Sequence, residues 1–255
     1  MFGQIFRRRA APHHSPARAP AGQRIYVVGD IHGRLDLLQA MAGRVAADLA
    51  DGTGAVAKTY FLGDLIDRGP DSAGVIELLS RGAFPTPVMA LRGNHEDMLL
   101  RFLDNPSALE DWRKFGGLET LHAYGAPVAD AMRGTGYAAA RDALAAAMPA
   151  HHRAFLERAP LSVDLGDYFL CHAGVRPGRP FEAQEADDLL WIREPFLKFE
   201  GDFGKIVVHG HTPVEAPDVR ANRINIDTGA YASSILTALA LEDERRRFIS
   251  TAPGP

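Results

Sequence analysis

Apolar runs that end in glycine and a polar residue recur along the chain, and most lead into a segment with helical periodicity. Three such runs, at 25–28, 59–62 and 88–91, predict short buried strands. The segments that follow, at 35–49, 72–80 and 96–103, carry apolar residues at helical spacing and predict amphipathic helices. This alternation predicts an α/β protein in which helices join parallel strands.

The second half of the chain predicts a helical insertion and a return to strands. Residues 107–158 are rich in alanine and predict a helical cap inserted into the sheet domain. Strands are then expected at 161–164 and 168–171, joined by a hairpin turn at Gly166-Asp167. Further strands are predicted at 205–208, 223–226 and 235–241.

Residues 1–23 predict a basic, proline-containing tail. The segment includes Pro12, Pro16 and Pro20 and has no apolar periodicity, so it cannot bury enough surface to offset the entropy of ordering it. We therefore expect a disordered tail at 1–23 and a single domain at 24–250.

Composition disfavours several classes of partner. The 255-residue chain has a formal net charge of −4, so no overall basic field favours nucleic acid or an anionic membrane. It contains no apolar stretch of the roughly 20 residues that a membrane span needs, and no signal peptide is expected. The single cysteine, Cys171, excludes an internal disulfide and a thiolate cluster, which fits a reducing compartment. Cytoplasmic localisation is the default expectation.

Five predicted strands end in side chains that can bind a metal ion. They are followed by the motifs Gly29-Asp30-Ile31-His32-Gly33, Gly63-Asp64-Leu65-Ile66-Asp67-Arg68-Gly69, Arg92-Gly93-Asn94-His95-Glu96, His172-Ala173-Gly174 and Gly210-His211-Thr212. In an open α/β sheet, ligands bind at the carboxyl ends of the strands. We therefore expect these carboxylate, imidazole and amide groups to meet at one edge.

These residue types are suited to a pair of divalent cations. Two cations about 3.5–4 Å apart need a bridging carboxylate and several nitrogen and oxygen ligands, and together they can stabilise both oxygens of an in-line displacement. Aspartate, asparagine and neutral histidine suit manganese, iron or zinc. An aspartate that only caps a helix is the common alternative at any one of these positions; five motifs together favour ligation.

In this order, the five motifs resemble the calcineurin-like metallophosphoesterases. The Asp-Arg-Gly and Arg-Gly-Asn-His-Glu extensions resemble the phosphoprotein phosphatase branch, which includes the bacteriophage lambda-type serine/threonine protein phosphatases. The resemblance runs from about residue 26 to 230. It implies two packed mixed β-sheets flanked by helices, with the dinuclear metal site at the strand ends.

The resemblance also implies roles for individual residues. It assigns the metal ligands as Asp30, His32, Asp64, Asn94, His172 and His211, with Asp64 bridging. His95 would protonate the leaving oxygen, and Asp67 would orient it. Substrate phosphate would be bound by Arg68, Arg92 and Arg193. His209, just upstream of His211, is expected to be structural.

The implied reaction is hydrolysis of phosphomonoesters by a metal-bridging hydroxide, without a phosphoenzyme. Two divalent ions are expected, manganese first, with iron or zinc as alternatives. Phosphoserine or phosphothreonine in proteins or peptides is the preferred substrate. Hydrolysis of a nucleotide, a dinucleoside polyphosphate such as diadenosine tetraphosphate, is the alternative. A catalytically silent metal-binding interaction module is a further alternative, which the presence of both His95 and Asp67 disfavours.

Overall fold

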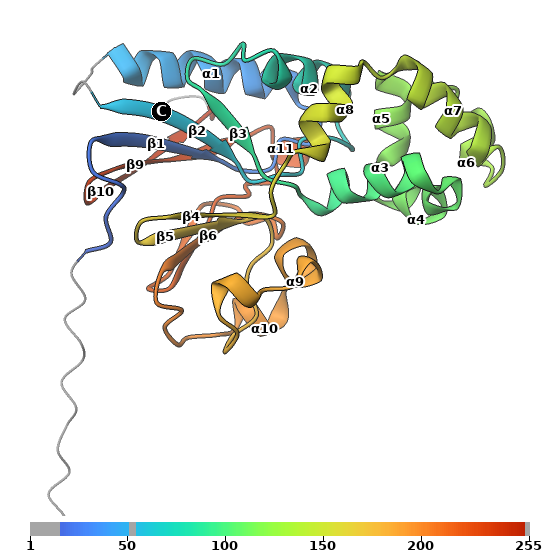
Figure 1. Ribbon diagram of the computed structural model, residues 1–255. Coiled ribbons are helices and arrows are strands. Elements are labelled where there is room, and N and C mark those ends of the chain that lie inside the picture. Colours follow the sequence, from blue (N-terminus) through green and yellow to red (C-terminus); the bar gives the residue numbers. More distant parts are fainter. Residues whose placement is uncertain (1–15, 51–54, 253–255) are drawn as a thin grey trace, which may run out of the picture.

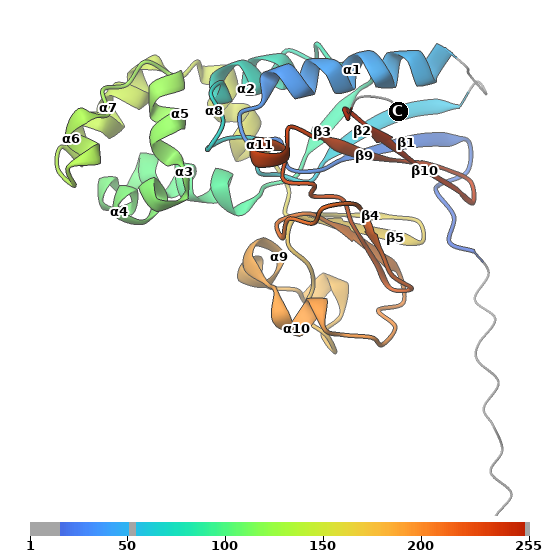
Figure 2. The same cartoon turned by 180° about the vertical axis from the view of Figure 1, so that it is seen from behind.

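Two five-stranded mixed sheets lie face to face in the computed structural model, which describes residues 16–50 and 55–252 (Figures 1 and 2). The first sheet has the order β10-β9-β1-β2-β3 and consists of β1 (Gln23–Val28), β2 (Val56–Phe61), β3 (Val88–Ala90), β9 (Thr237–Glu242) and β10 (Arg245–Ser250). The second has the order β4-β5-β6-β8-β7 and consists of β4 (Ser162–Leu165), β5 (Tyr168–Cys171), β6 (Ile206–His209), β7 (Asp218–Val219) and β8 (Arg223–Asn225).

Each sheet is parallel in its centre and antiparallel at an edge. β1 pairs in parallel with β2, and β2 with β3, whereas β9 runs antiparallel to both β1 and β10. In the second sheet, β6 lies parallel to β5 and β8, and β4 and β7 are antiparallel. The parallel pairs place the ends of β1, β2, β3, β5 and β6 toward the region where the sheets meet the helical cap. The predicted two-sheet α/β fold is confirmed.

Alternating side chains divide the core into layers. Ile25 and Val27 of β1 face Leu170 and Val208 across the interface between the sheets. The intervening residues of β1 point the other way, onto α1 (Leu35–Ala50) and α2 (Ser72–Ser80). On the far side of the second sheet, Phe169 and Val207 pack with residues of α9 (Ala186–Trp191) and α10 (Glu194–Leu197). The order of the layers is therefore helix, sheet, sheet, helix (Figure 1).

The helical insertion forms one end of the molecule (Figures 1 and 2). It follows α3 (Asn94–Asp104) and comprises η1 (Pro106–Ala108), α4 (Leu109–Trp112), η2 (Arg113–Phe115), α5 (Gly117–Ala123), α6 (Ala129–Met132), α7 (Tyr137–Ala147) and α8 (Ala150–Glu157). Leu109, Trp112 and Leu144 are fully buried in the same hydrophobic cluster as α1 and α2. The cap is thus continuous with the core. The remaining helical segments are η3 (Phe181–Ala183) and α11 (Ala230–Ser233).

The disordered tail predicted at 1–23 extends too far, because residues from 16 onward contact the folded domain. Residues 1–15 lie outside the described residues, but Ala19 is 5% exposed and packs against the core between the sheets. The amides of Arg18 and Ala19 donate to the Asp167 carboxylate and the Asp243 carbonyl. These contacts connect segments far away in sequence, which the composition of residues 16–23 does not reveal. No helix among the described residues has the length and apolar character to cross a bilayer.

A hydrogen-bonded chain ties the cap to the body. The Tyr124 hydroxyl donates to Nδ1 of His152 at 2.9 Å, and Nε2 of His152 donates to the Glu77 carboxylate on α2 at 2.6 Å. His151 reaches the same carboxylate at 2.7 Å. His152 is 3% exposed, so losing a partner leaves a buried polar atom unsatisfied.

We expect Tyr124→Phe to lower the free energy of unfolding by about 1 kcal/mol, because it removes one hydrogen bond inside the protein. Tyr137→Phe is the matched control, since that hydroxyl bonds to Glu110 at the surface and its loss should have almost no effect. Urea denaturation of both variants measures the difference. Equal stabilities would show that the Tyr124–His152 bond, which orients His152 toward Glu77, does not stabilise the cap.

Candidate dinuclear metal site

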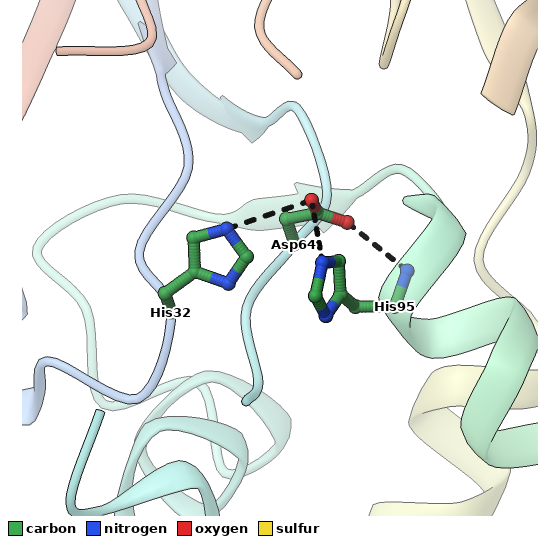
Figure 3. Close-up of side chains that lie close together, drawn as sticks. All are labelled: His32, Asp64 and His95. Carbon is green, nitrogen blue, oxygen red and sulfur yellow. Dashed lines mark hydrogen bonds and ion pairs between the residues drawn. The ribbon is translucent and has the colours of Figure 1, made fainter. Parts of the chain in front are cut away.

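The carboxylate of Asp64, in the loop after β2, lies at the centre of the site (Figure 3). Its Oδ2 is 3.6 Å from Nε2 of His32 and 3.7 Å from Nε2 of His95, and its Oδ1 is 3.3 Å from Nε2 of His172. Two groups of side chains with closely spaced ligand atoms share Asp64: one adds His32 and His95, and the other adds His172 and His211. All of these residues are buried.

Each of the six predicted metal ligands follows the end of a strand, as expected from the sequence. Asp30 and His32 follow β1, Asp64 follows β2, and Asn94 begins α3 after β3. His172 and His211 follow β5 and β6 of the other sheet. The six predicted ligands therefore come from both sheets and converge at their junction.

The imidazoles of His32 and His172 are held in one tautomer. Nδ1 of His32 donates to the Ile66 carbonyl at 2.9 Å, and Nδ1 of His172 donates to the Leu62 carbonyl at 3.0 Å. Each Nε2 therefore carries a lone pair that faces Asp64. Second-sphere carbonyls orient metal-bound histidines in this way.

Acceptor atoms crowd together in the half of the site near His211. The Asn94 Oδ1 atom is 2.9 Å from Nε2 of His172 and 2.9 Å from Nδ1 of His211, and these two nitrogens are 3.1 Å apart. Nε2 of His211 is buried and has no hydrogen-bond partner in the described part of the chain. Lone pairs at such distances repel unless a positive charge lies among them. This donor set fits a divalent cation.

Asp30 reaches the site through the backbone of His211. Its Oδ2 accepts the backbone N–H of His211 at 3.0 Å, while its buried Oδ1 has no hydrogen-bond partner among the described residues. A side chain at Gly210 would collide with Asp30, because a Cβ atom there would lie 2.0 Å from Oδ1. Asp30 lies outside the two compact groups around Asp64, and its orphaned oxygen is available to a cation.

Buried negative charge accumulates around Asp64. Burial and the charges of Asp227 and Asp64 raise the pKa of Asp30 well above its usual range. Burial and Asp64 raise the pKa of Glu96 to about 7, and burial raises that of Asp227 to about 6. The pKa of Asp64 is lowered: burial opposes this shift, but the charges of His172 and His95 outweigh it. The site is therefore suited to binding added positive charge.

Glu96 holds the loop that carries Asp64, a role that the sequence analysis did not assign. One carboxylate oxygen accepts the backbone N–H groups of Asp64 at 2.8 Å and Gly93 at 2.7 Å, and the other accepts that of Leu65 at 2.8 Å. The bond to Gly93 also caps the start of α3. A side chain at Gly93 would place Cβ 2.2 Å from Asp64 Oδ1, so only glycine permits this approach.

His95 and Asp67 form a buried pair that accepts hydrogen bonds from the cap. Asp67 Oδ2 accepts Nδ1–H of His95 at 2.6 Å and the indole N–H of Trp112 at 2.6 Å, and Oδ1 accepts the Thr120 hydroxyl at 2.5 Å. Burial lowers the pKa of His95, but Asp64 and Asp67 outweigh it and raise the pKa overall. The pair is therefore arranged to hold a proton. Trp112 and Thr120 lie 45 and 53 residues after Asp67, and no local pattern marks them.

The three predicted phosphate-binding arginines differ in position. The Arg68 guanidinium is 3.2 Å from Nε2 of His32 and 3.3 Å from Nε2 of His95. Arg193 is exposed and lies 3.5 Å from the carbonyl of His211. Arg92 instead donates to the carbonyl of Glu157 at the end of α8. Arg68 and Arg193 thus flank the two halves of the site, whereas Arg92 contacts the cap.

Strained backbone is concentrated at the site. Left-handed φ values occur at His32 (48°), Asp64 (50°), Asp67 (73°), Arg68 (66°) and His211 (64°). Such conformations cost energy in residues with a side chain and persist where the surroundings enforce them, often at functional sites. His209 is buried and contacts Phe196 instead of the Asp64 groups.

Comparison with known proteins finds relatives that span most of this chain. A bis(5′-nucleosyl)-tetraphosphatase PrpE (asymmetrical) from Oceanobacillus iheyensis is 28% identical over 252 residues, covering 90% of this chain and 92% of the relative. The protein of the same name from Bacillus velezensis is 28% identical over 240 residues, covering 83% and 86%.

Solved structures share the fold. A crystal structure described provisionally as a diadenosine tetraphosphatase has a TM-score of 0.63 at 19% identity and covers 93% of this chain and 100% of its own. A cold-active protein-tyrosine phosphatase of Shewanella sp. has a TM-score of 0.54 at 14% identity, covering 91% and 83%. The profile of the calcineurin-like phosphoesterases matches residues 23–234, which is most of the sequence. The chain belongs to the calcineurin-like phosphoesterase family.

Proposed function

We propose that this protein hydrolyses dinucleoside tetraphosphates asymmetrically, releasing a nucleoside monophosphate and a nucleoside triphosphate. The observation that carries the reaction type is the convergence of five strand ends on the buried Asp64 carboxylate. The substrate class is supported by relatives named as asymmetrical tetraphosphatases, which align with 83–90% of the chain. The phosphoprotein substrate preferred from sequence lacks comparable support.

Bound divalent cations would supply an activated water and neutralise phosphoryl charge. In our proposal, Asp30, His32, Asp64, Asn94, His172 and His211 hold them. Manganese suits these nitrogen and oxygen donors, and iron or zinc would also fit. Asp64 belongs to both groups, so its carboxylate would be the ligand shared by the two cations.

The remaining side chains act on the substrate. Arg68 and Arg193 bind the oxygens of the phosphate chain, since planar guanidinium groups match phosphate geometry. His95 donates a proton to the leaving oxygen, and Asp67 keeps its imidazole oriented and favours its cationic form. The leaving group is already a weakly basic phosphate oxygen, so His95 contributes less here than it would with a serine alkoxide.

The decisive experiment compares turnover of diadenosine tetraphosphate, a phosphothreonine peptide and a phosphotyrosine peptide with manganese added. We expect kcat/KM for the nucleotide to exceed that for either peptide by at least about tenfold, with AMP and ATP as products separated by chromatography. Faster hydrolysis of a peptide would overturn the substrate class. ADP as the only product would contradict asymmetric cleavage.

Asp64→Asn should remove metal from the protein, because it removes the negative charge of the side chain shared by both ligand clusters. Loss of affinity should exceed the roughly 10–100-fold seen when only an outer-sphere partner is lost. Elemental analysis after dialysis measures the bound metal. Asp67→Asn is the matched control and should retain it, since the oxygens of Asp67 are bonded to His95, Trp112 and Thr120. Two metals retained by Asp64→Asn would exclude a bridging role.

Trp112→Phe should lower kcat for diadenosine tetraphosphate by about tenfold, because Asp67 loses a charge-assisted hydrogen bond that orients it. KM and metal content should stay the same, as an aromatic ring is retained beside Phe102. Thr120→Val removes the other donor and should act in the same direction. An unchanged kcat together with a lower free energy of unfolding would make Trp112 a purely structural residue.

A further inference from the structure

Two aromatic side chains border the site without taking part in the proposed chemistry. Phe115 lies in η2 of the cap, and Trp191 lies at the end of α9, 76 residues later. Phe115 is 37% exposed, and Trp191 is partly exposed. Their ring centroids are 5.9 Å apart at an interplanar angle of 72°. We call this pair the aromatic rim.

The rim touches both halves of the site. Phe115 lies edge-on to His95, with centroids 6.2 Å apart, and Trp191 lies edge-on to His211 at 6.1 Å. A group bonded to a phosphate held beside His95 and His211 would therefore be within reach of both rings.

A third aromatic residue near the site already has a partner. Tyr231 of α11 carries the Arg68 guanidinium over its ring at 4.6 Å and meets His32 edge-on at 5.3 Å. Its cation–π contact positions Arg68 for phosphate. Tyr231 is itself 39% exposed, but Arg68 covers one face of its ring and it lies beside His32, whereas Phe115 and Trp191 together border both halves of the site.

Aromatic rings do not bind a phosphate chain, because phosphate oxygens need cations and N–H donors. They do bind flat heterocycles, and stacking of a nucleobase on an aromatic side chain contributes about 1–3 kcal/mol per base. In a nucleotide, only a ribose separates the base from its phosphate. Arg68 and Arg193 beside the rim supply the positive charge that the attached phosphates require.

We propose that Phe115 and Trp191 form a nucleobase subsite, on which a base of the substrate stacks while its phosphate occupies the metal site. The subsite rests on the proposed function and explains how a site built for phosphoryl groups selects nucleotides. One ring comes from the cap and the other from α9, so both elements define the specificity.

The test compares diadenosine tetraphosphate with inorganic tripolyphosphate, which contains the same type of anhydride but no base. Trp191→Ala and Phe115→Ala should each lower the ratio of kcat/KM for the nucleotide to kcat/KM for tripolyphosphate by about tenfold. Trp191→Phe should restore most of the ratio. Phe248→Ala is the matched control, because Phe248 is 43% exposed on β10 and should leave both rates unchanged.

A binding measurement separates this subsite from the proposed reaction. The chain contains two tryptophans, Trp112 and Trp191. Titration with AMP should quench the fluorescence of the wild-type protein, and Trp191→Phe should abolish the quenching because Trp112 is buried. Ribose 5-phosphate should quench neither protein.

The outcomes are distinct. An unchanged ratio in both alanine variants, or no quenching by AMP at saturation, overturns the subsite even if diadenosine tetraphosphate is hydrolysed. Quenching that depends on Trp191 in a protein that does not hydrolyse diadenosine tetraphosphate supports the subsite and refutes the proposed reaction.

Discussion

The structure depends on one electrostatic constraint: several carboxyl groups are buried together where the two sheets meet. Asp30, Asp64, Glu96 and Asp227 are each 2% exposed or less. Burying like charges is costly, and a group of this kind either takes up protons or binds cations. Three of the four have raised pKa values, whereas Asp64, surrounded by imidazoles, stays charged. Glu96 and the left-handed backbone at Asp64 hold this arrangement in place.

Elements with a strong apolar signal could be predicted from sequence, and elements held only by partners could not. β1, α1 and the β4–β5 hairpin carry apolar runs, helical periodicity or a turn signal, and the structure contains them with bounds that shift by at most two residues. β10 was missed because Arg245–Ser250 is polar and lies at a sheet edge, where backbone pairing with β9 suffices. The short helices α9 and α10 were missed for a related reason, since their form depends on packing against Phe169 and Val207.

The candidate site likewise contains residues that the sequence predicts and residues that it does not. The side chains around Asp64 follow glycine-bearing strand ends, so their convergence could be expected from the order of the motifs. Trp112 and Thr120 could not be found in this way, because their partner Asp67 is remote in sequence and belongs to a different element. The motifs also could not identify the class of substrate. A metal site recognises the phosphoryl group common to proteins and nucleotides, and the groups that could distinguish them lie on the surrounding segments.

One segment of the cap contacts both the Asp67–His95 pair and the entrance of the site. Between Trp112 and Thr120 it donates two hydrogen bonds to the Asp67 carboxylate, and the Gly116 carbonyl accepts the N–H of Arg68 at 3.2 Å. Phe115, within this same segment, is in contact with His95. Any displacement of this segment would therefore alter His95, the proposed proton donor, and Arg68, the proposed phosphate-binding residue, together. An insertion that carried only a binding surface would not need these buried bonds, so in the proposed reaction the cap supports the catalytic residues as well as the entrance of the site.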